Sequence, residues 1–241
     1  MRLRNTKIFF IIERNVKIRQ EAFIFETSLK HAFKTPFSIF NVNDEADPNI
    51  IRFQTSSLNS FSNLQVAQNK IILETNYDKN YDINYQLVSE YLAAKIKDLK
   101  PVLLKEKLIF IGVLSLFDNE MNVAEILPLI KEQTNFGLID NDIIELKYNY
   151  KKKYENKYML SIDVSPYTRF SAQLPAPQLI KGSFPLKVDS KGLQIKLDFN
   201  NNIGRDPNKE LSIDVIDVML SDYFNFIKKN NLNNYIKGLL L

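Results

Sequence analysis

The chain contains one histidine, His31, and no cysteine. Serine catalysis needs a base beside the nucleophile and thiolate chemistry needs cysteine, so these two facts narrow the available mechanisms. His31 lies in the segment SLKHAFK, and no G-x-S-x-G turn that would present a nucleophilic serine occurs in the sequence. We therefore expect His31 to be a partly exposed structural residue, and we assign no catalytic residue.

Carboxylates cluster at two places where a metal ion would find oxygen ligands. Asp44, Glu45 and Asp47 share one loop, and Asp140 and Asp142 flank a turn. A calcium loop needs ligands at alternating positions, a central glycine and a terminal glutamate, and neither cluster has this set. The six glycines form no phosphate-binding loop. We expect solvated turns, with no metal site and no cofactor.

Lysine and tyrosine interleave in the segment YNYKKKYENKY, residues 148–158. Stacking on tyrosine and neutralisation of phosphates by lysine would suit a nucleic acid. The alternation also predicts a hairpin over 143–164 whose tyrosines face a core and whose lysines protect a solvated edge. The whole chain has a net charge of +4, and this excess lies in the first 20 residues, whereas the rest of the chain is balanced. The candidate nucleic-acid contacts are Arg2, Arg4, Lys7, Lys147, Lys151, Lys153 and Lys157.

Residues 165–186 form a proline-rich stretch that we expect to be irregular. Long loops without secondary structure are uncommon inside a compact domain and often carry function. The stretch is either a partner-binding arm or an internal connection held by its aromatic side chains. Its candidate partner-binding residues are Tyr167, Phe170, Pro175, Pro177 and Phe184.

The C-terminal tail, residues 231–241, places an apolar group behind an asparagine-rich spacer. Apolar termini of this kind dock either on their own core or on another chain. We predict that the tail is an association element. Its candidate contacts are Tyr235, Ile236, Leu239, Leu240 and Leu241.

The elements that must position these residues follow from hydrophobic periodicity. Pro101 is expected to end the first long helix and Asp82 to cap it. The last helix is expected to begin near Pro207, although alternation in its sequence leaves a strand open. Strands are expected at two places within 7–29 and at 50–56, 63–67, 70–76, 107–117, 143–164 and 191–199, and helices over 83–100, 123–134 and from 207 to about 230.

This order of elements predicts an α+β fold in which antiparallel sheets are covered by helices. We expect two similar halves, residues 1–120 and 121–230, followed by the tail at 231–241, although one continuous domain stays open. No apolar stretch approaches the length that crosses a membrane, and the first apolar run is too short for a signal peptide. The protein is therefore expected to be cytoplasmic, without membrane contact.

The stretches 61–78, 83–96, 108–119 and 191–228 resemble an uncharacterised bacterial family of about 250 residues. Members of this family are distributed sporadically, often beside mobile-element or phage-defence genes. The resemblance implies an accessory or interaction role and transfers no catalytic residue.

These observations favour a non-enzymatic protein-interaction or accessory subunit, one that associates with itself or with a protein partner in a larger assembly of bacterial or phage origin. An antiviral defence or mobile-element system is the expected context. The alternative is a nucleic-acid-binding subunit that uses the basic first strands and the lysine–tyrosine hairpin.

Overall fold

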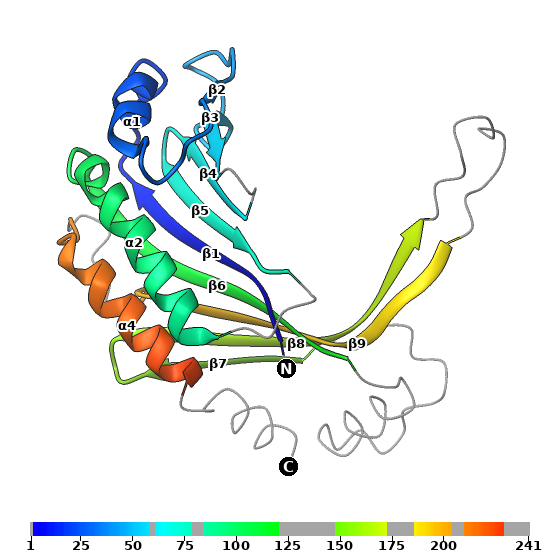
Figure 1. The fold of residues 1–241 in the computed structure, drawn as a ribbon. Coiled ribbons are helices and arrows are strands. Elements are labelled where there is room, and N and C mark those ends of the chain that lie inside the picture. Colours follow the sequence, from blue (N-terminus) through cyan, green and yellow to red (C-terminus); the bar gives the residue numbers. More distant parts are fainter. Residues whose placement is uncertain are drawn as a thin grey trace, which may run out of the picture.

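A computed structural model describes residues 2–57, 61–78, 84–120, 148–172, 186–203 and 210–228. These residues confirm the α+β class, because three helices accompany one antiparallel sheet of nine strands (Figure 1). The strand order across the sheet is β2-β3-β4-β5-β1-β6-β9-β8-β7. The elements are β1 (Arg2–Ile12), α1 (Ala22–Leu29), β2 (Ser38–Ile39), β3 (Ile51–Ser56), β4 (Ser62–Ala67), β5 (Lys70–Asn76), α2 (Tyr85–Leu103), β6 (Leu108–Glu120), β7 (Tyr148–Tyr154), β8 (Tyr158–Ala172), β9 (Leu186–Asn200) and α4 (Asp214–Lys228).

Strands β1 and β6 lie side by side at the centre of the sheet and pair along almost their whole length. Both are rich in β-branched and aromatic residues, which suit a pleated surface with neighbours on both edges. Because β6 also pairs with β9, strands from both expected halves join one continuous sheet. The expected boundary after residue 120 falls at the end of β6.

Helices α1, α2 and α4 lie along the same face of the sheet (Figure 1). Helices α2 and α4 are antiparallel neighbours, since Lys100 of α2 pairs with Asp217 of α4 and Lys228 donates a hydrogen bond to Gln86. Helix α4 turns its apolar residues towards the sheet at helical spacing, as expected for an amphipathic helix. This geometry confirms the helix and excludes the strand alternative over residues 214–228.

A row of hydroxyl groups crosses the helix-covered face of the sheet. The side chains of Ser62, Thr75, Thr6 and Ser115 lie in register on β4, β5, β1 and β6, and all four are buried. Ser62 Oγ lies 2.8 Å from Thr75 Oγ1, and Thr6 Oγ1 lies 3.1 Å from Ser115 Oγ. The row satisfies its own polar groups, which keeps it compatible with an apolar layer.

Strands β8 and β9 continue as a two-stranded ribbon after the rest of the sheet has ended (Figure 1). In the described residues, β7 pairs with β8 only as far as Val164 and β6 pairs with β9 only as far as Gly192. Gly192 is required at this point, because an added Cβ would lie 2.1 Å from the Asn119 carbonyl oxygen. The expectation of an irregular segment from 165 onwards is therefore wrong for 165–172, where β-pairing with residues 186–194 continues.

Two further local predictions are wrong. Residues 22–29 form α1 rather than a strand, because Phe25 packs edge-on against Phe53 of β3, with ring centroids 5.0 Å apart, and this contact selects the helical period. Helix α2 continues through Pro101 to Leu103. Its cap is Asn84, whose side chain accepts hydrogen bonds from the next backbone amides, whereas Asp82 lies outside the described residues.

Candidate functional site

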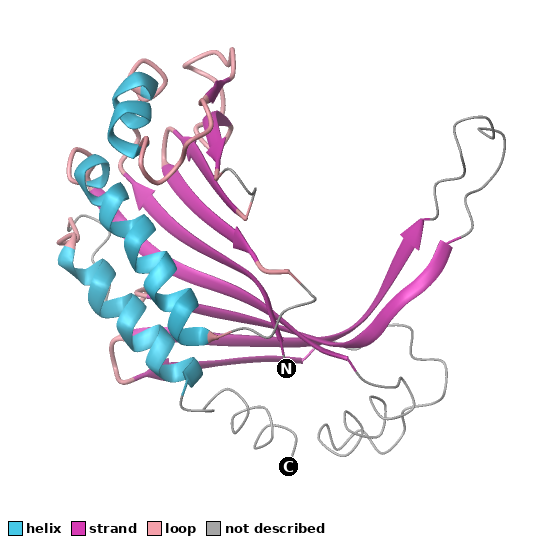
Figure 2. Ribbon diagram, viewed as in Figure 1, coloured by secondary structure: helices cyan, strands magenta, loops and turns pink. Residues whose placement is uncertain are grey.

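The face of the sheet opposite the three helices is the candidate site, and we call it the open face. Figure 2 shows that the sheet bends so that this face is concave, with the β8–β9 ribbon rising at one end. Side chains reach it by strand alternation, because every second residue of each strand points away from the helices. In the described part of the chain no helix lies on this side.

An apolar band runs across the middle of the open face. In the register of β1 and β6, Lys7 lies beside Leu114 and Phe9 lies beside Gly112. These residues point to the open face, whereas the buried Ile8 and Phe10 point to the helix side. Gly112 has no side chain, and the ring of Phe110, also on β6, lies over it, because a Cβ added at Gly112 would be 3.2 Å from that ring. The members of the band are half-buried or nearly buried, and they are Phe9, Ile11, Ile72, Phe110, Leu114 and Leu116.

An uncharged polar zone adjoins the band on β3 and β4. A hollow of about 290 Å³ lies there, between these strands and the segment that contains Thr35. The hydroxyl of Thr35 accepts from the Ser56 backbone amide at 3.1 Å, which fixes the wall of the hollow. Amide side chains of Gln54, Asn63 and Gln65 line it. Such groups donate and accept hydrogen bonds and suit a neutral polar ligand, such as a peptide backbone.

A charged zone adjoins the band on the other side, at the base of the ribbon. Asp118 of β6 is almost fully buried and forms ion pairs with two arginines. Arg4 Nε lies 3.2 Å from Asp118 Oδ2, and Arg169 Nη2 donates to Asp118 Oδ1 at 2.9 Å. The guanidinium of Arg169 also lies 4.8 Å from the centre of the Tyr167 ring. These contacts fasten the ribbon to the centre of the sheet.

The structure brings part of the predicted basic set together. Lys151 and Lys153 extend from β7 on the open-face side, opposite Ser161 and Met159, and both are exposed. The predicted separation of faces is confirmed in the register, because Tyr150 pairs with Ile162 on the helix side. Lys157 lies exposed in the turn between β7 and β8, and Lys147 lies outside the described residues.

The basic residues of β1 do not join that set. Arg4 pairs with Asp118, and Lys7 pairs with Glu74 at 3.1 Å. Four strand spacings separate β1 from β7, which amounts to about 19 Å. Arg2 lies at the start of β1, opposite Asp118. On the strands between these two groups the exposed Lys196 of β9 lies beside Asp163 of β8, so basic and acidic residues mix and the described residues form no continuous basic groove.

The predicted partner-binding residues fall mostly in parts that the structure does not describe. Tyr167 and Phe170 lie on β8 within or beside the ribbon. Outside the described residues are Pro175, Pro177, Phe184, Tyr235, Ile236, Leu239, Leu240, Leu241 and the two acidic residues Asp140 and Asp142.

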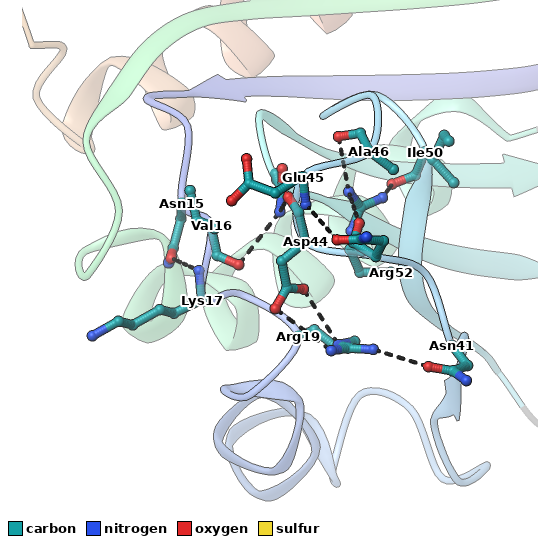
Figure 3. Close-up of polar contacts among 12 residues, drawn as sticks. Asn15, Val16, Lys17, Arg19, Asn41, Asp44, Glu45, Ala46, Ile50 and Arg52 are labelled. Atoms are coloured by element: carbon teal, nitrogen blue, oxygen red, sulfur yellow. Dashed lines mark hydrogen bonds and ion pairs between the residues drawn. The ribbon is translucent and has the colours of Figure 1, made fainter.

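The acidic loop at 43–50 is occupied by internal contacts (Figure 3). Asp44 faces Arg19, with Arg19 Nε 3.5 Å from Asp44 Oδ1. The fully buried Arg52 donates hydrogen bonds to backbone carbonyls of the same loop, including that of Ile50 at 2.7 Å. The Asp47 carboxylate accepts from the Asn49 amide, which lowers its pKa. Among the described residues, no group of three or more metal-ligating side chains occurs.

A second pair of carboxylates was not anticipated from the sequence. Asn15 Nδ2 donates to Glu106 at 3.1 Å and to Glu21 at 3.1 Å, so one amide bridges two acidic groups. Burial raises the pKa of Glu106, and the nearby Glu21 raises it further. No described histidine, lysine or nucleophile is bonded to this pair, while His31 lies exposed after α1. The arrangement stabilises the joint between β1, α1 and the end of α2.

Sequence reasoning missed the open face as a site. Its signal was present in the alternation of β1 and β6, where apolar residues occupy both faces instead of one. Comparison of the chain with models of known protein families gives no match, and no curated protein matches it. None of the described helices is long and apolar enough to span a bilayer.

Proposed function

We propose that the protein is a non-catalytic binding subunit that holds a polypeptide partner on its open face. The observation that carries this proposal is the apolar band from Phe9 to Leu116 at the floor of a concave sheet surface that no described helix covers. Apolar side chains gathered in this way, with polar groups on both sides, are typical of an interaction surface.

The zones beside the band favour a polypeptide over a small molecule. The amide side chains on β3 and β4 match the donors and acceptors of a peptide backbone. The β8–β9 ribbon has two open edges in the described residues, and an extended segment pairs readily with such edges. A two-stranded ribbon is marginally stable in water, so an added strand or a covering surface would stabilise it.

Edge chemistry sets the direction in which a partner would approach. Lys151 and Lys153 on the edge strand β7 oppose strand addition at that end of the sheet. The opposite edge, β2, carries the exposed Ile39 followed by Phe40 and has no charged residue. A partner would therefore lie across the band, between the β2 end and the ribbon.

A catalytic function has less support. Two described carboxylates of the open face, Asp118 and Glu74, form ion pairs with Arg4, Arg169 and Lys7. None of the contacts described there joins a nucleophile to a base. An accessory role in a larger bacterial assembly, as the family resemblance implies, agrees with a binding surface without catalytic groups.

Site-specific photo-cross-linking tests this proposal. A photoactivatable phenylalanine analogue is placed at Phe9 in the full chain, and a matched probe replaces Val218, which is 52% exposed on α4. Irradiation in cells should give a discrete protein adduct from position 9 and none from position 218. Equal adducts from both positions would contradict the proposal. An adduct that only nuclease removes would favour the nucleic-acid alternative.

A further inference from the structure

An apolar pocket of about 300 Å³ lies on the helix side of the molecule, away from the open face. It lies between the first turns of α2 and the ends of β4 and β5. Phe61, Leu87 and Tyr91 line it and are at least one-third exposed, although they are large apolar or aromatic residues. Thr75 also lines the pocket, and the Tyr91 hydroxyl lies 2.8 Å from Ser62 Oγ, so the end of the hydroxyl row borders an apolar cavity.

The C-terminal end of α4 lies beside this pocket. Lys228, the last residue of α4, donates a hydrogen bond to Gln86, which immediately precedes Leu87 in α2. The Lys100–Asp217 pair holds the two helices together at their other ends, so this placement is fixed at two points. The chain therefore leaves α4 near the residue that precedes the pocket-lining Leu87.

Thirteen residues, 229–241, follow Lys228 and lie outside the described part of the chain. Six extended residues, at about 3.3 Å each, span roughly 20 Å. This length is sufficient to reach from Lys228 to the pocket wall at Leu87. The apolar residues that follow recur at spacings of one and four, which is one face of a helix. They are Tyr235, Ile236, Leu239, Leu240 and Leu241.

We infer that the chain's own C-terminal tail occupies the pocket between α2 and the β4–β5 ends. Its apolar face covers Phe61, Leu87 and Tyr91, which otherwise stay in water. A tethered segment acts at an effective concentration in the millimolar range, so the intramolecular contact prevails over the same contact from a second copy. The tail is then part of the monomer, in place of the association element expected from the sequence, and it leaves the open face free for a partner.

The absence of tryptophan from the chain allows a clean test in the full-length protein. Tyr235→Trp introduces a single reporter into the tail. Its emission should lie at short wavelength and resist quenching by acrylamide. Leu87→Asp in the same background should shift the emission to that of exposed tryptophan. The matched control is Leu104→Asp, because Leu104 is 67% exposed at the far end of α2 and Leu87 is 62% exposed at its start. This control should leave the emission unchanged.

Phe61→Ser is a second pocket variant and should expose the reporter in the same way. Circular dichroism verifies that each variant is folded. Emission typical of exposed tryptophan before any pocket substitution overturns the inference, and so does an equal response to Leu87→Asp and Leu104→Asp. Emission that moves to longer wavelength on dilution, together with a dimeric mass by light scattering, would assign the pocket to the tail of a second copy and contradict the intramolecular contact.

Discussion

The hydroxyl of Tyr223, on α4, donates a hydrogen bond to Ser115 Oγ in the middle of β6, and neither side chain is exposed to solvent. This contact joins the last described helix to the hydroxyl row that crosses β4, β5, β1 and β6. The ring of Tyr223 also packs against Phe199, with centroids 5.8 Å apart. The polar bond and the ring contact together set how α4 lies on the sheet, opposite the apolar band of the open face.

Replacing Tyr223 with phenylalanine should lower the free energy of unfolding by about 1 kcal/mol, because Ser115 keeps Thr6 as a partner and only one buried hydrogen bond is lost. Urea unfolding at neutral pH measures this change. Tyr150→Phe is the control and should have a smaller effect, because Tyr150 is only half-buried.

The same tyrosine predicts a loss of stability at alkaline pH. Burial raises the pKa of Tyr223 above its ordinary value of 10.0. Above about pH 10 the unfolded chain therefore releases a proton that the folded chain retains, and rising pH favours unfolding. Urea midpoints at pH 8 and pH 11 should differ less in Tyr223→Phe than in the unmodified protein. Tyr77 and Tyr158 share the raised pKa, so the difference becomes smaller without disappearing. An unchanged difference would contradict the burial argument.

The carboxylates of Glu106 and Glu21, which Asn15 bridges, predict a second pH dependence of stability, in the acidic range. Because burial raises the pKa of Glu106 above 4.5, the stability that its protonated form contributes is present below that value and is lost as pH rises through the folded-state pKa. Glu106→Gln should therefore gain stability relative to the unmodified protein between about pH 4 and pH 7. Thermal unfolding across this range measures the gain. Glu45→Gln, at an exposed loop position, should show no such trend.

Arg169 should control the ribbon more than Arg4 does, although both bind Asp118. Arg169 makes a two-point contact with the carboxylate, with nitrogen–oxygen distances of 2.5 and 2.9 Å, and it belongs to the ribbon strand itself. Arg169→Met should speed amide hydrogen exchange in residues 168–172 and 186–190 while leaving 159–164 protected. Arg4→Met breaks one ion pair at 3.2 Å in the same cluster and should leave ribbon exchange unchanged. Equal effects of the two variants would show that the two-point contact between Arg169 and Asp118 does not hold the ribbon in place.

The sequence was sufficient for elements with long, regular patterns. The alternation in residues 143–164 predicts a hairpin with Tyr150 and Ile162 on one face and Lys151 on the other, and the described residues 148–164 agree. The period of the last helix favours α4, although the alternation of residues 211–220 left a strand open until the structure showed the helix at Asp214–Lys228. A regular pattern is most informative where it repeats over many residues.

Short or unusual segments depended on contacts that are distant in sequence. Residues 22–29 alternate like a strand, yet Phe25 is buried against Phe53 while Phe23 is 75% exposed on the other side of α1. The proline-containing residues 165–172 stay in a strand because Gly192 allows β6 to approach β9 where the ribbon begins. Neither Phe53 nor Gly192 is recognisable as a partner from spacing along the chain.

The open face escaped prediction for a related reason. Phe9 and Leu114 look like ordinary core residues in the sequence, since both lie in apolar strands. Only the arrangement of α1, α2 and α4 on one side of the sheet reveals which face the described helices leave uncovered (Figure 1). The ion pairs of Arg4 and Lys7 are equally hidden in the sequence, because their carboxylate partners Asp118 and Glu74 lie on other strands.

Native mass spectrometry of two matched variants, each with its bound partner, tests whether a protein partner binds the open face. Leu114→Lys places a charge in the apolar band, and Val218→Lys places the same charge on the exposed side of α4. Each full-length variant is tagged, expressed in the organism that naturally makes the protein, and purified with its partners for native mass spectrometry. Equal midpoints of thermal unfolding for the two variants verify that both are folded. We expect that Val218→Lys retains the protein partner of the unmodified chain and that Leu114→Lys is isolated without it. Retention of the same partner by both variants would contradict the assignment of the open face as the binding surface.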